Sequence, residues 1–304
     1  MIYDVAKIEI AEVCNHVITM LSGLTRSMTK FLTIQMRLLF LFLLLSMGTV
    51  SGEEPHHTTA YIGAPGETDL LLTYSTYSTD HFWNKHGKKL PTYNHFKRQS
   101  YLLYAEYAFN NCNSFTFHGG YSAVQETLNG NSRAVEDIEL GWKHLICTNE
   151  ASALTAQLIA IVPVGDTKSS VRYGKWGAQA GLLYSNMFCL LSRSGWYDLE
   201  LGYRWYQDFP SDRVIASAAV GYDITSRIQV IATGKCDYGI NNGHADGNLN
   251  NIAFHGNYRL FKAKIECVAR LFSHVSVSVG AFKHFWGRNV GAGGGFYCGT
   301  WIDF

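Results

Sequence analysis

The chain has 304 residues, which suits one large domain or two small ones, and its formal net charge is +1 at pH 7. Without a basic excess the sequence offers no electrostatic surface for nucleic acid, so we exclude nucleic acid as a partner. Charged residues make up only 16% of the chain, below the roughly 25% of soluble domains, whereas aromatic residues reach 14% and there are 29 Gly but only 5 Pro. This balance favours many glycine- and tyrosine-rich strands over helices.

A signal peptide is predicted within residues 36–52. One arginine precedes an apolar run that is shorter than the ~20 residues of a membrane-spanning helix, and the small residues at 50–52 fit the cleavage rule. Residues 1–35 are then an extension upstream of the true start, and residues 53–67 form a short periplasmic N-terminal segment. An uncleaved membrane anchor is the alternative interpretation of the apolar run.

Alternation with a period of two recurs from about residue 68 to the C-terminus and predicts strands. In "WYDLELGYRWY" (196–206), Tyr, Leu and Trp occupy one face while Asp, Glu and Arg occupy the other, and "VEDIELGWKHLI" (135–146) and "RIQVIATGKCDYG" (227–239) repeat the scheme. Many segments are longer than the roughly 5–6 residues of soluble strands and reach the roughly 9–11 that cross a membrane. The predicted strands are 68–77, 99–109, 114–125, 134–147, 152–163, 175–190, 196–207, 213–223, 226–239, 256–271, 274–286 and 291–304.

The predicted connections alternate between short and long. The even-numbered ones are tight, such as "DITS", and the odd-numbered ones are mostly long, beginning with residues 78–98. Outer-membrane barrels alternate short periplasmic turns with long outer loops in this way. Because a barrel must close to leave no backbone edge in lipid, the last strand, which ends at Phe304, is expected to pair with the first. We therefore predict an all-β fold, a transmembrane antiparallel up-and-down β-barrel of about 12 strands over residues 68–304, in a bacterial outer membrane. A soluble secreted β-sandwich is the architectural alternative.

Two resemblances extend this prediction. The closing "GGGFYCGTWIDF" resembles the C-terminal signature of bacterial outer-membrane proteins, which implies that Phe304 is a signal for the barrel-assembly machinery. "VEDIELGWKHLI", "WYDLELGYRWY" with "AAVGYDITSRIQV", and "FKHFWGRNVGAGGGFYCGTWIDF" are similar to the outer-membrane family labelled "meta-pathway of phenol degradation", over residues 65–304. That family resemblance implies a barrel with a transport function. The six cysteines after the predicted signal peptide depart from the family's pattern.

Charges on the polar face of the strands are the predicted lumen-lining residues. They are expected either to line a polar pore with a weak solute preference, or to pair across the lumen and plug it. Both signs occur, which argues against a strongly selective filter. The predicted set is Asp137, Glu139, Lys143, Asp198, Glu200, Arg204, Lys235, Asp237, Lys264, Glu266 and Arg270.

The function expected from this pattern is that of a passive, porin-like channel or transporter for small solutes. A structural or surface-exposed envelope protein with a plugged lumen, disulfide-linked through its cysteines, is one alternative, and a lipid-acting barrel enzyme is another. An enzyme is not expected, because no hydrolase motif is present and His118 and Ser122 lie roughly 13 Å apart along one strand. Cys112 and Cys147 are expected to be neighbours on the periplasmic rim and form the predicted disulfide.

No cofactor or metal site is predicted. The cysteines lack CxxC or Cys/His spacing, and "GAGGGF" precedes a strand where a dinucleotide site requires a helix. The expected partners are outer-membrane lipid, lipopolysaccharide and the barrel-assembly machinery. The first long connection, residues 78–98, holds three His and five Lys or Arg and is expected to be a solvated surface loop, to contact anionic lipopolysaccharide or to fold inward.

Overall fold

The structure is a computed structural model that describes residues 59–127, 130–164, 173–208, 210–243 and 256–304. Every regular element in these ranges is a β-strand, as the composition predicts, and none of the described segments is a helix long and apolar enough to cross a bilayer. The predicted upstream extension and signal peptide lie outside the described residues. The strands are β1 (Thr68–Trp83), β2 (Lys89–Asn110), β3 (Asn113–Glu126), β4 (Gly130–Val135), β5 (Ile138–Thr148), β6 (Ser152–Val162), β7 (Gly177–Leu190), β8 (Arg193–Tyr206), β9 (Arg213–Asp223), β10 (Ile228–Gly239), β11 (Arg259–Phe272), β12 (Val275–Arg288), β13 (Val290–Gly291) and β14 (Gly294–Asp303).

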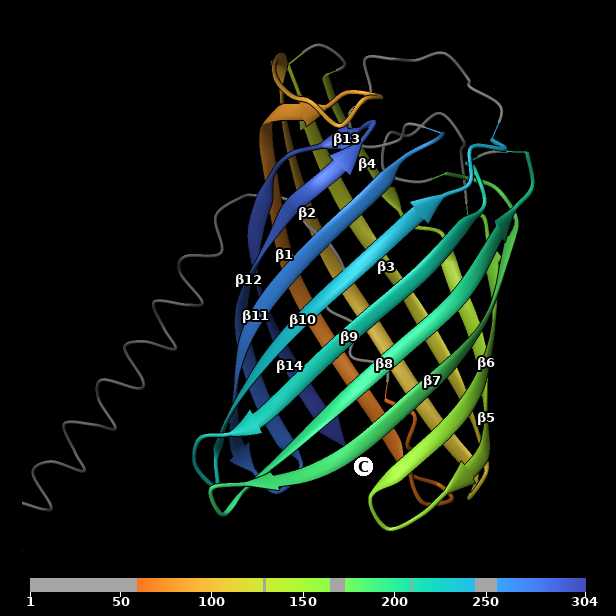
Figure 1. The fold of residues 1–304 in the computed structure, drawn as a ribbon, viewed down its shortest axis with the longest axis vertical. Coiled ribbons are helices and arrows are strands. Elements are labelled where there is room, and N and C mark those ends of the chain that lie inside the picture. Colours follow the sequence, from red (N-terminus) through yellow and green to blue (C-terminus); the bar gives the residue numbers. More distant parts are fainter. Residues whose placement is uncertain (1–58, 128–129, 165–172, 209, 244–255) are drawn as a thin grey trace, which may run out of the picture. The chain divides into compact units, whose positions relative to one another are not determined.

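The described strands form one closed antiparallel barrel (Figure 1). Strands pair with their neighbours along the chain, and β14 pairs with β1, so the last strand closes on the first as predicted. Leu70 of β1 lies between Ile302 of β14 and Ala105 of β2 in this register. β4 and β5 both pair with β3, so together they form one strand of the wall in two pieces. In the same way, β13 and β14 both pair with β1 and together form one strand of the wall. The described part of the wall therefore consists of twelve strands, the number predicted.

The first hairpin extends farther than the sequence predicts. Residues 78–98 are expected to be a long loop, but β1 continues to Trp83 and β2 begins at Lys89, and these two residues pair across the hairpin. Asn84 stabilises the tight turn, because its Oδ1 accepts two backbone N–H groups of the turn at 2.9 and 3.0 Å. A hairpin held by backbone hydrogen bonds needs no apolar face, so hydrophobic periodicity cannot reveal it.

The two ends of the barrel differ in their connections. At one end, here the short-turn rim, a few residues join neighbouring strands, as in the turn of Leu191 and Ser192 between β7 and β8. Both residues have a left-handed backbone, with φ of 50° and 61°, which is the type I′ geometry of a two-residue hairpin. The opposite end, here the long-connection rim, carries the connections between β6 and β7 and between β10 and β11.

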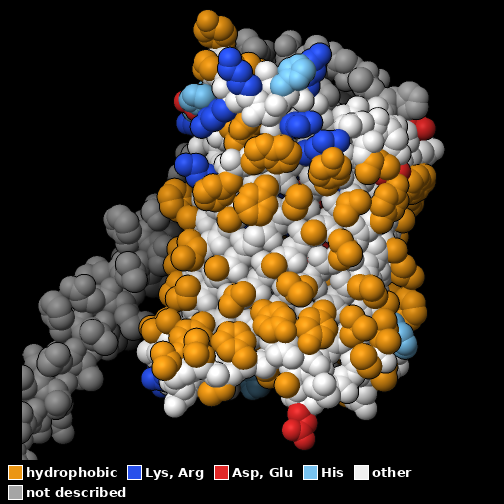
Figure 2. Space-filling view, in the orientation of Figure 1, with side chains coloured by type: hydrophobic (Ala, Val, Ile, Leu, Met, Phe, Trp, Pro, Cys, Tyr) orange, Lys and Arg blue, Asp and Glu red, His pale blue; other side chains and the backbone are white. Residues whose placement is uncertain are grey.

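The outer face of the barrel wall is apolar (Figure 2). Large hydrophobic side chains point outward along the strands, and Leu201 and Phe296 are 60% and 69% exposed. Trp142 and Trp205 are also exposed. Lys, Arg and His side chains gather beyond the apolar wall, at the long-connection rim. Such a continuous apolar surface is far larger than the patches that soluble monomers expose.

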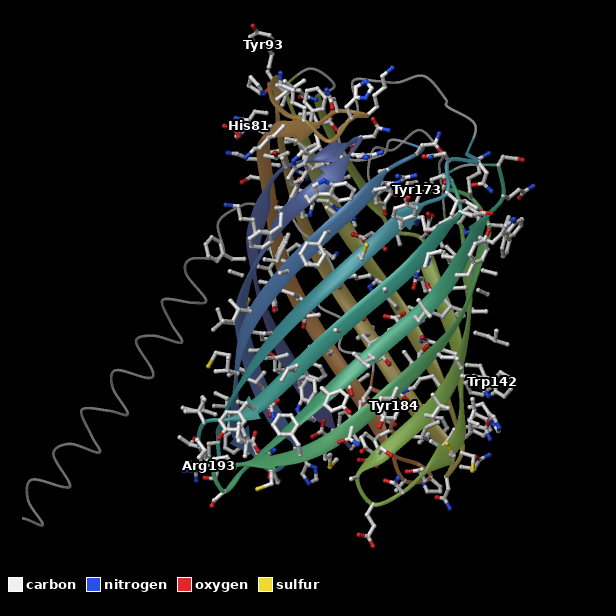
Figure 3. All side chains as sticks on the ribbon, in the orientation of Figure 1. His81, Tyr93, Trp142, Tyr173, Tyr184 and Arg193 are labelled. Atoms are coloured by element: carbon white, nitrogen blue, oxygen red, sulfur yellow. The ribbon has the colours of Figure 1, made fainter. Side chains whose placement is uncertain are left out.

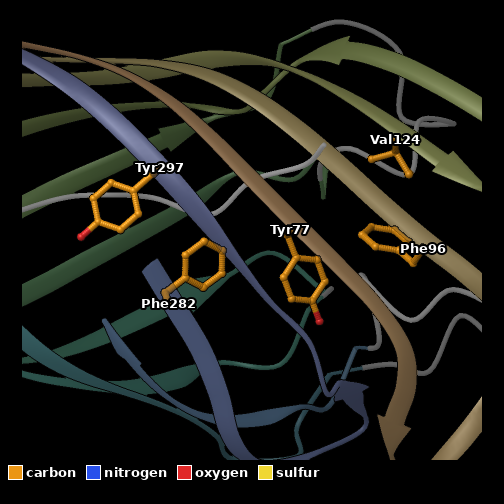
Figure 4. Close-up of a cluster of buried hydrophobic side chains, with 5 residues drawn as sticks. All are labelled: Tyr77, Phe96, Val124, Phe282 and Tyr297. Atoms are coloured by element: carbon orange, nitrogen blue, oxygen red, sulfur yellow. The ribbon is translucent and has the colours of Figure 1, made fainter. Parts of the chain in front are cut away.

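Aromatic side chains fill part of the barrel interior (Figure 4). Tyr77, Phe96, Val124, Phe282 and Tyr297 come from five strands and form a buried cluster. The rings of Tyr77 and Phe282 are stacked with their centroids 6.3 Å apart. This cluster lies on the wall formed by β1, β2, β3, β12 and β14, and the polar space of the interior is lined by β2, β3 and β5 to β11.

Candidate functional site in the barrel lumen

A break between β4 and β5 turns two consecutive carboxylates into the lumen. β4 ends at Val135 and β5 begins at Ile138, and the alternation of buried and exposed side chains changes phase between them. Glu136 and Asp137 consequently both line a cavity in the lumen. Alternation in the sequence predicts that Asp137 faces the lumen and Glu136 does not, because a regular strand places adjacent side chains on opposite faces.

Two ion pairs hold charged side chains at this cavity. Arg98 Nη2 lies 2.7 Å from Glu136 Oε1, and Arg204 Nη1 lies 2.7 Å from Glu139 Oε1. Glu136 also accepts hydrogen bonds from two serine hydroxyls, one of them that of Ser122. All four charged side chains are largely screened from solvent, so the pairing offsets part of the cost of removing these charges from water.

A third ion pair lies deeper in the lumen. Lys143 Nζ donates to the two carboxylate oxygens of Glu106 at 2.7 and 2.9 Å, and the Lys143 side chain is completely buried. Ser114 and Tyr104 donate to the same carboxylate at 2.6 and 2.7 Å. Lys143 Nζ also donates to the backbone carbonyl of Tyr61 at 3.4 Å, which links the ion pair to the chain before β1.

That chain, the N-terminal segment (residues 59–67), enters the barrel at the short-turn rim. Ala60 is completely buried, its N–H donates to Ser185 Oγ at 2.7 Å, and its carbonyl accepts a hydrogen bond from Thr155. The Tyr61 hydroxyl donates to a backbone carbonyl of the β5–β6 turn at 2.6 Å. The sequence predicts a short periplasmic segment here and gives no sign that it occupies the lumen.

At the long-connection rim, an arginine is enclosed by three tyrosine rings. The Arg213 guanidinium carbon lies 5.5, 5.0 and 5.0 Å from the ring centroids of Tyr173, Tyr206 and Tyr258. Arg213 also donates to the hydroxyls of Tyr206, at 2.7 Å, and Tyr258. Tyr173 belongs to the β6–β7 connection (Figure 3), and its N–H and that of the next residue donate to Asp137 Oδ2 at 3.2 and 3.0 Å. Burial raises the pKa of the Tyr173 phenol, so this ring stays neutral.

Two adjoining cavities occupy the polar part of the lumen. Their volumes are about 160 and about 70 Å³, the larger one reaching the Arg213 cluster. Both are lined by charged and polar side chains together with a few aliphatic ones. The residues that line both cavities are His118, Glu139, Arg204, Lys235 and Lys262.

Most of the predicted lumen-lining residues lie on the inward face. The ones that line the cavities are Asp137, Glu139, Glu200, Arg204, Lys235, Asp237 and Lys264. Lys143, Asp198 and Glu266 are buried outside the two cavities. Arg270 is exposed at the short-turn rim, because β11 ends two residues later. A role of these residues in conduction stays a prediction.

Several charged residues of the lumen are absent from the predicted set. Glu106 is the single charge in the apolar stretch "YLLYAEYAF". Because a buried charge requires a partner, a lone charge in such a stretch predicts a paired carboxylate inside the barrel. Lys262 shares the face of Lys264 and could have been found by alternation. Arg98 lies in a predicted loop and Arg213 at the end of a predicted strand, so alternation does not mark either as a lumen residue.

The six described cysteines are free thiols. Cys112 and Cys147 lie on the same short-turn rim, since the Cys112 carbonyl accepts the N–H of Leu145 at 2.7 Å. Their disulfide stays a prediction. Within the described residues, no group of three His, Cys, Asp or Glu side chains is placed to hold a metal ion.

Phe304, the predicted assembly signal, lies at the end of the closing strand. Its backbone N–H donates to Thr68 O at 3.0 Å, and its carbonyl accepts the Thr68 N–H at 3.3 Å. The side chain is 68% exposed. The residue therefore closes the barrel through its backbone and leaves its ring available on the outside.

Comparisons with known proteins identify the fold. No protein-family model matches the chain, and no curated protein matches it. Among solved structures, an outer-membrane channel from Pseudomonas putida F1 is 14% identical, with a TM-score of 0.64 over 83% of this chain and 100% of that one. The KdgM porin is 7% identical, with a TM-score of 0.45 over 78% of this chain and 99% of that one. LpxR from Salmonella typhimurium is 10% identical, with a TM-score of 0.47 over 78% and 99%. The chain thus shares the β-barrel fold of the Pseudomonas channel.

Proposed function

We propose that the chain is a bacterial outer-membrane β-barrel that acts as a passive channel for small solutes. The apolar outer face supports the membrane location, because lipid stabilises such a surface and water does not. Nearly every wall strand is also longer than the roughly 9–11 residues that a strand needs to cross a bilayer. By the usual orientation of such barrels, the short-turn rim faces the periplasm and the long-connection rim faces outward.

The observation that carries the channel proposal is a polar cavity system inside an apolar wall. A barrel of about twelve strands is wider than the eight-strand barrels that side chains fill completely. Here the aromatic cluster fills one side, and charged residues from β2 and from β5 to β11 line the space that remains. Lining of this kind suits polar solutes, and both signs of charge occur along it.

A structural envelope protein with a plugged lumen is the second proposal. The N-terminal segment occupies the short-turn rim, and the Arg213 cluster occupies the other end. If the protein is a channel, these two contacts are gates that move during conduction. If it is a structural protein, they are permanent closures.

The first experiment expresses the full chain in a Gram-negative host and isolates its outer membranes. The purified protein is then tested for heat-modifiable gel migration and for conductance in planar bilayers. Compact migration of the unboiled protein with discrete conducting steps supports both the barrel and the channel. Compact migration without conductance supports the structural role, and a protein that stays soluble without detergent contradicts the membrane location.

The family and partner assignments are parts of the same proposal. Membership of the phenol meta-pathway family is supported by the sequence resemblance and by the barrel fold. Lipopolysaccharide is the proposed partner of the hairpin of β1 and β2, where Lys85 and Lys88 lie in the turn and Lys89 begins β2. The barrel-assembly machinery is the proposed partner of the C-terminal strand during insertion.

A further inference from the structure

Two cations, Lys97 of β2 and Arg133 of β4, point away from the lumen. Phe96 and Ala134, their neighbours in sequence, pack in the buried aromatic cluster, so the alternation of each strand directs Lys97 and Arg133 to the outer face. Arg133 is exposed and Lys97 is partly exposed. In the part of the chain that the structure describes, neither side chain makes a hydrogen bond or an ion pair. Both cations are therefore available to a partner outside the barrel.

The two cations flank a small residue, Ala123 of β3. In the strand register Arg133 is the direct partner of Ala123, and Lys97 is the partner of Gln125, two residues along β3 on the same face. Gln99 of β2 is the direct partner of Ala123 on its other side. Directly opposed residues lie about 5 Å apart and diagonal ones about 7–8 Å, so the long side chains of Lys97 and Arg133 can converge over Ala123. We call this surface the β2–β4 patch, formed by Lys97, Gln99, Ala123, Gln125 and Arg133.

The acidic residues of β1 to β4 leave the β2–β4 patch with a net positive charge. Glu106 and Glu126 are buried on the inward faces of β2 and β3, and β4 contains no acid. Asp80 is exposed on β1, on the opposite side of Lys97 from Arg133, and its carboxylate contacts the imidazole of His81 at 2.6 Å. Asp80 can offset at most one of the two cations, and the outer faces of β3 and β4 hold no acid to offset the other.

The β2–β4 patch lies at the level where the membrane-crossing part of the wall ends. β3 begins at Asn113 on the short-turn rim, and the roughly 9–11 residues that cross a bilayer reach to Tyr121 or Ala123. Tyr101 and Tyr121 are direct partners in the row before the patch, and they are 50% and 43% exposed on the outer face. Tyrosine is enriched at membrane interfaces. The patch would therefore meet lipid head groups, with apolar wall on its short-turn side.

Cations on the outer face are not a general feature of this wall. The strands β6, β7, β9 and β10 contain two Lys or Arg residues, Arg213 and Lys235, and both line the lumen. The outer faces of these four strands thus carry no lysine or arginine. A requirement for solubility alone would not concentrate unpaired cations on β2 and β4, which favours a specific anionic partner on this side of the barrel.

We propose that the β2–β4 patch binds the phosphate groups of lipopolysaccharide, whose acyl chains lie along the tyrosine row and the apolar wall. Arg133 can bind a phosphate through two parallel hydrogen bonds, Lys97 supplies a point charge, and Gln125 adds an amide donor. The inference rests on the proposed membrane location and orientation, and it is independent of conduction. Unlike the contact proposed for the hairpin of β1 and β2, this site belongs to the wall, where head group and acyl chains can be held together.

The test compares wild-type protein with the patch variant Lys97→Gln/Arg133→Gln and with the control variant Lys283→Gln/Arg193→Gln. The control also removes one lysine and one arginine, both at exposed positions outside the patch. Heat-modifiable migration shows first that each variant is folded, and Arg133→Gln alone replaces the patch variant if the latter does not fold. Native mass spectrometry in detergent then titrates each protein with three probes: lipid A with two phosphates, the same lipid A without phosphates, and phosphatidylglycerol.

We expect wild-type protein and the control variant to bind lipid A with two phosphates equally well. The patch variant should bind it about tenfold more weakly, because each cation near a membrane surface strengthens the attraction of an anionic lipid by about fivefold. Removal of the phosphates from lipid A should abolish the difference between wild-type protein and the patch variant.

Three results would overturn the site: equal binding of both forms of lipid A by wild-type protein, equally tight binding of phosphatidylglycerol, or an equal loss in the control variant. A compact membrane barrel that gives any of them contradicts this inference alone. A chain that stays soluble without detergent contradicts the proposed membrane location and this inference with it.

Discussion

Among the described residues, the most deeply buried charge is that of Lys143, which forms an ion pair with Glu106. The Lys143 side chain has no exposed surface, and that of Glu106 is 9% exposed. Removing one partner of such a pair leaves the other charge buried without compensation, at a cost of about 3–5 kcal/mol. We expect Lys143→Met to lower the free energy of unfolding by about that amount. Urea unfolding in detergent, followed by tryptophan fluorescence, measures it.

The double variant separates charge from packing. Lys143→Met combined with Glu106→Gln removes both charges, so it should recover a large part of the lost free energy of unfolding. Lys283→Met, at an exposed position, should not be destabilised. If the double variant is as unstable as Lys143→Met alone, the contribution of this site comes from packing, and the prediction is wrong.

A second prediction at the scale of single residues concerns the turn between β7 and β8. Leu191 is 85% exposed and has φ of 50°, a backbone conformation that costs a bulky residue about 1 kcal/mol and that Asn and Gly tolerate. We expect Leu191→Asn with Ser192→Gly to raise the free energy of unfolding by about 1 kcal/mol. The temperature at which the compact gel species disappears measures the change. Leu190→Asn lies outside the left-handed positions and should give no gain, so an equal gain there would refute the turn argument.

At the scale of elements, the N-terminal segment is the part of the lumen that a small change can release. Ala60 is held by Ser185 and Thr155, whose side chains belong to β7 and β6. Removing both hydroxyls leaves the buried N–H and carbonyl of Ala60 without these partners, which costs about 1–3 kcal/mol for each group. We therefore expect Ser185→Ala with Thr155→Val to increase the open probability of the channel. Single-channel recording measures it.

The control for this variant lies on the same rim. Ser194→Ala replaces an exposed serine at the start of β8 and should leave conductance unchanged. Recordings in which the double variant conducts like wild type would show that the segment does not limit passage. Loss of the compact gel species would instead show that the two hydroxyls stabilise the barrel itself.

Strand elements could be predicted where their outer faces carry an apolar signal. Leu201 and Trp205 alternate with Glu200 and Arg204, and the structure places the first two outside and the others in the lumen. The break at Glu136 could not be predicted in this way, because it changes the phase of the alternation without a glycine or proline to mark it. The course of the N-terminal segment was equally hidden, since its contacts are hydrogen bonds with strands more than ninety residues away.

At the scale of the whole molecule, barrel closure was predictable from the alternation in the last strand. The pairing of β14 with β1 follows from it, because the first and last strands of a closed barrel must meet. The pairing of charges across the lumen was not predictable, because the Lys143–Glu106 and Arg204–Glu139 pairs depend on which strands face each other across the interior. Sequence alternation gives the face of a residue and not its partner on a distant strand.

A substitution of the C-terminal residue can separate the folding of the barrel from its delivery to the membrane. Phe304 exchanges two backbone hydrogen bonds with Thr68, and a substitution of its side chain preserves them. Its ring is largely exposed, so Phe304→Ala should change the free energy of unfolding by less than about 0.5 kcal/mol and should refold in detergent like wild type. If the ring is the assembly signal that the resemblance implies, the same variant should be several-fold less abundant in the outer membrane of a Gram-negative host.

Phe296→Ala is the matched control for this last prediction. Phe296 lies on β14, which ends one residue before Phe304, and its side chain is 69% exposed on the outer face. Both substitutions remove similar apolar area from the outer face, and only the one at Phe304 alters the C-terminus. Quantitative immunoblots of outer-membrane fractions should show a loss for Phe304→Ala alone. Equal losses would attribute the defect to reduced lipid contact, and wild-type abundance of Phe304→Ala would remove the assembly role from this residue.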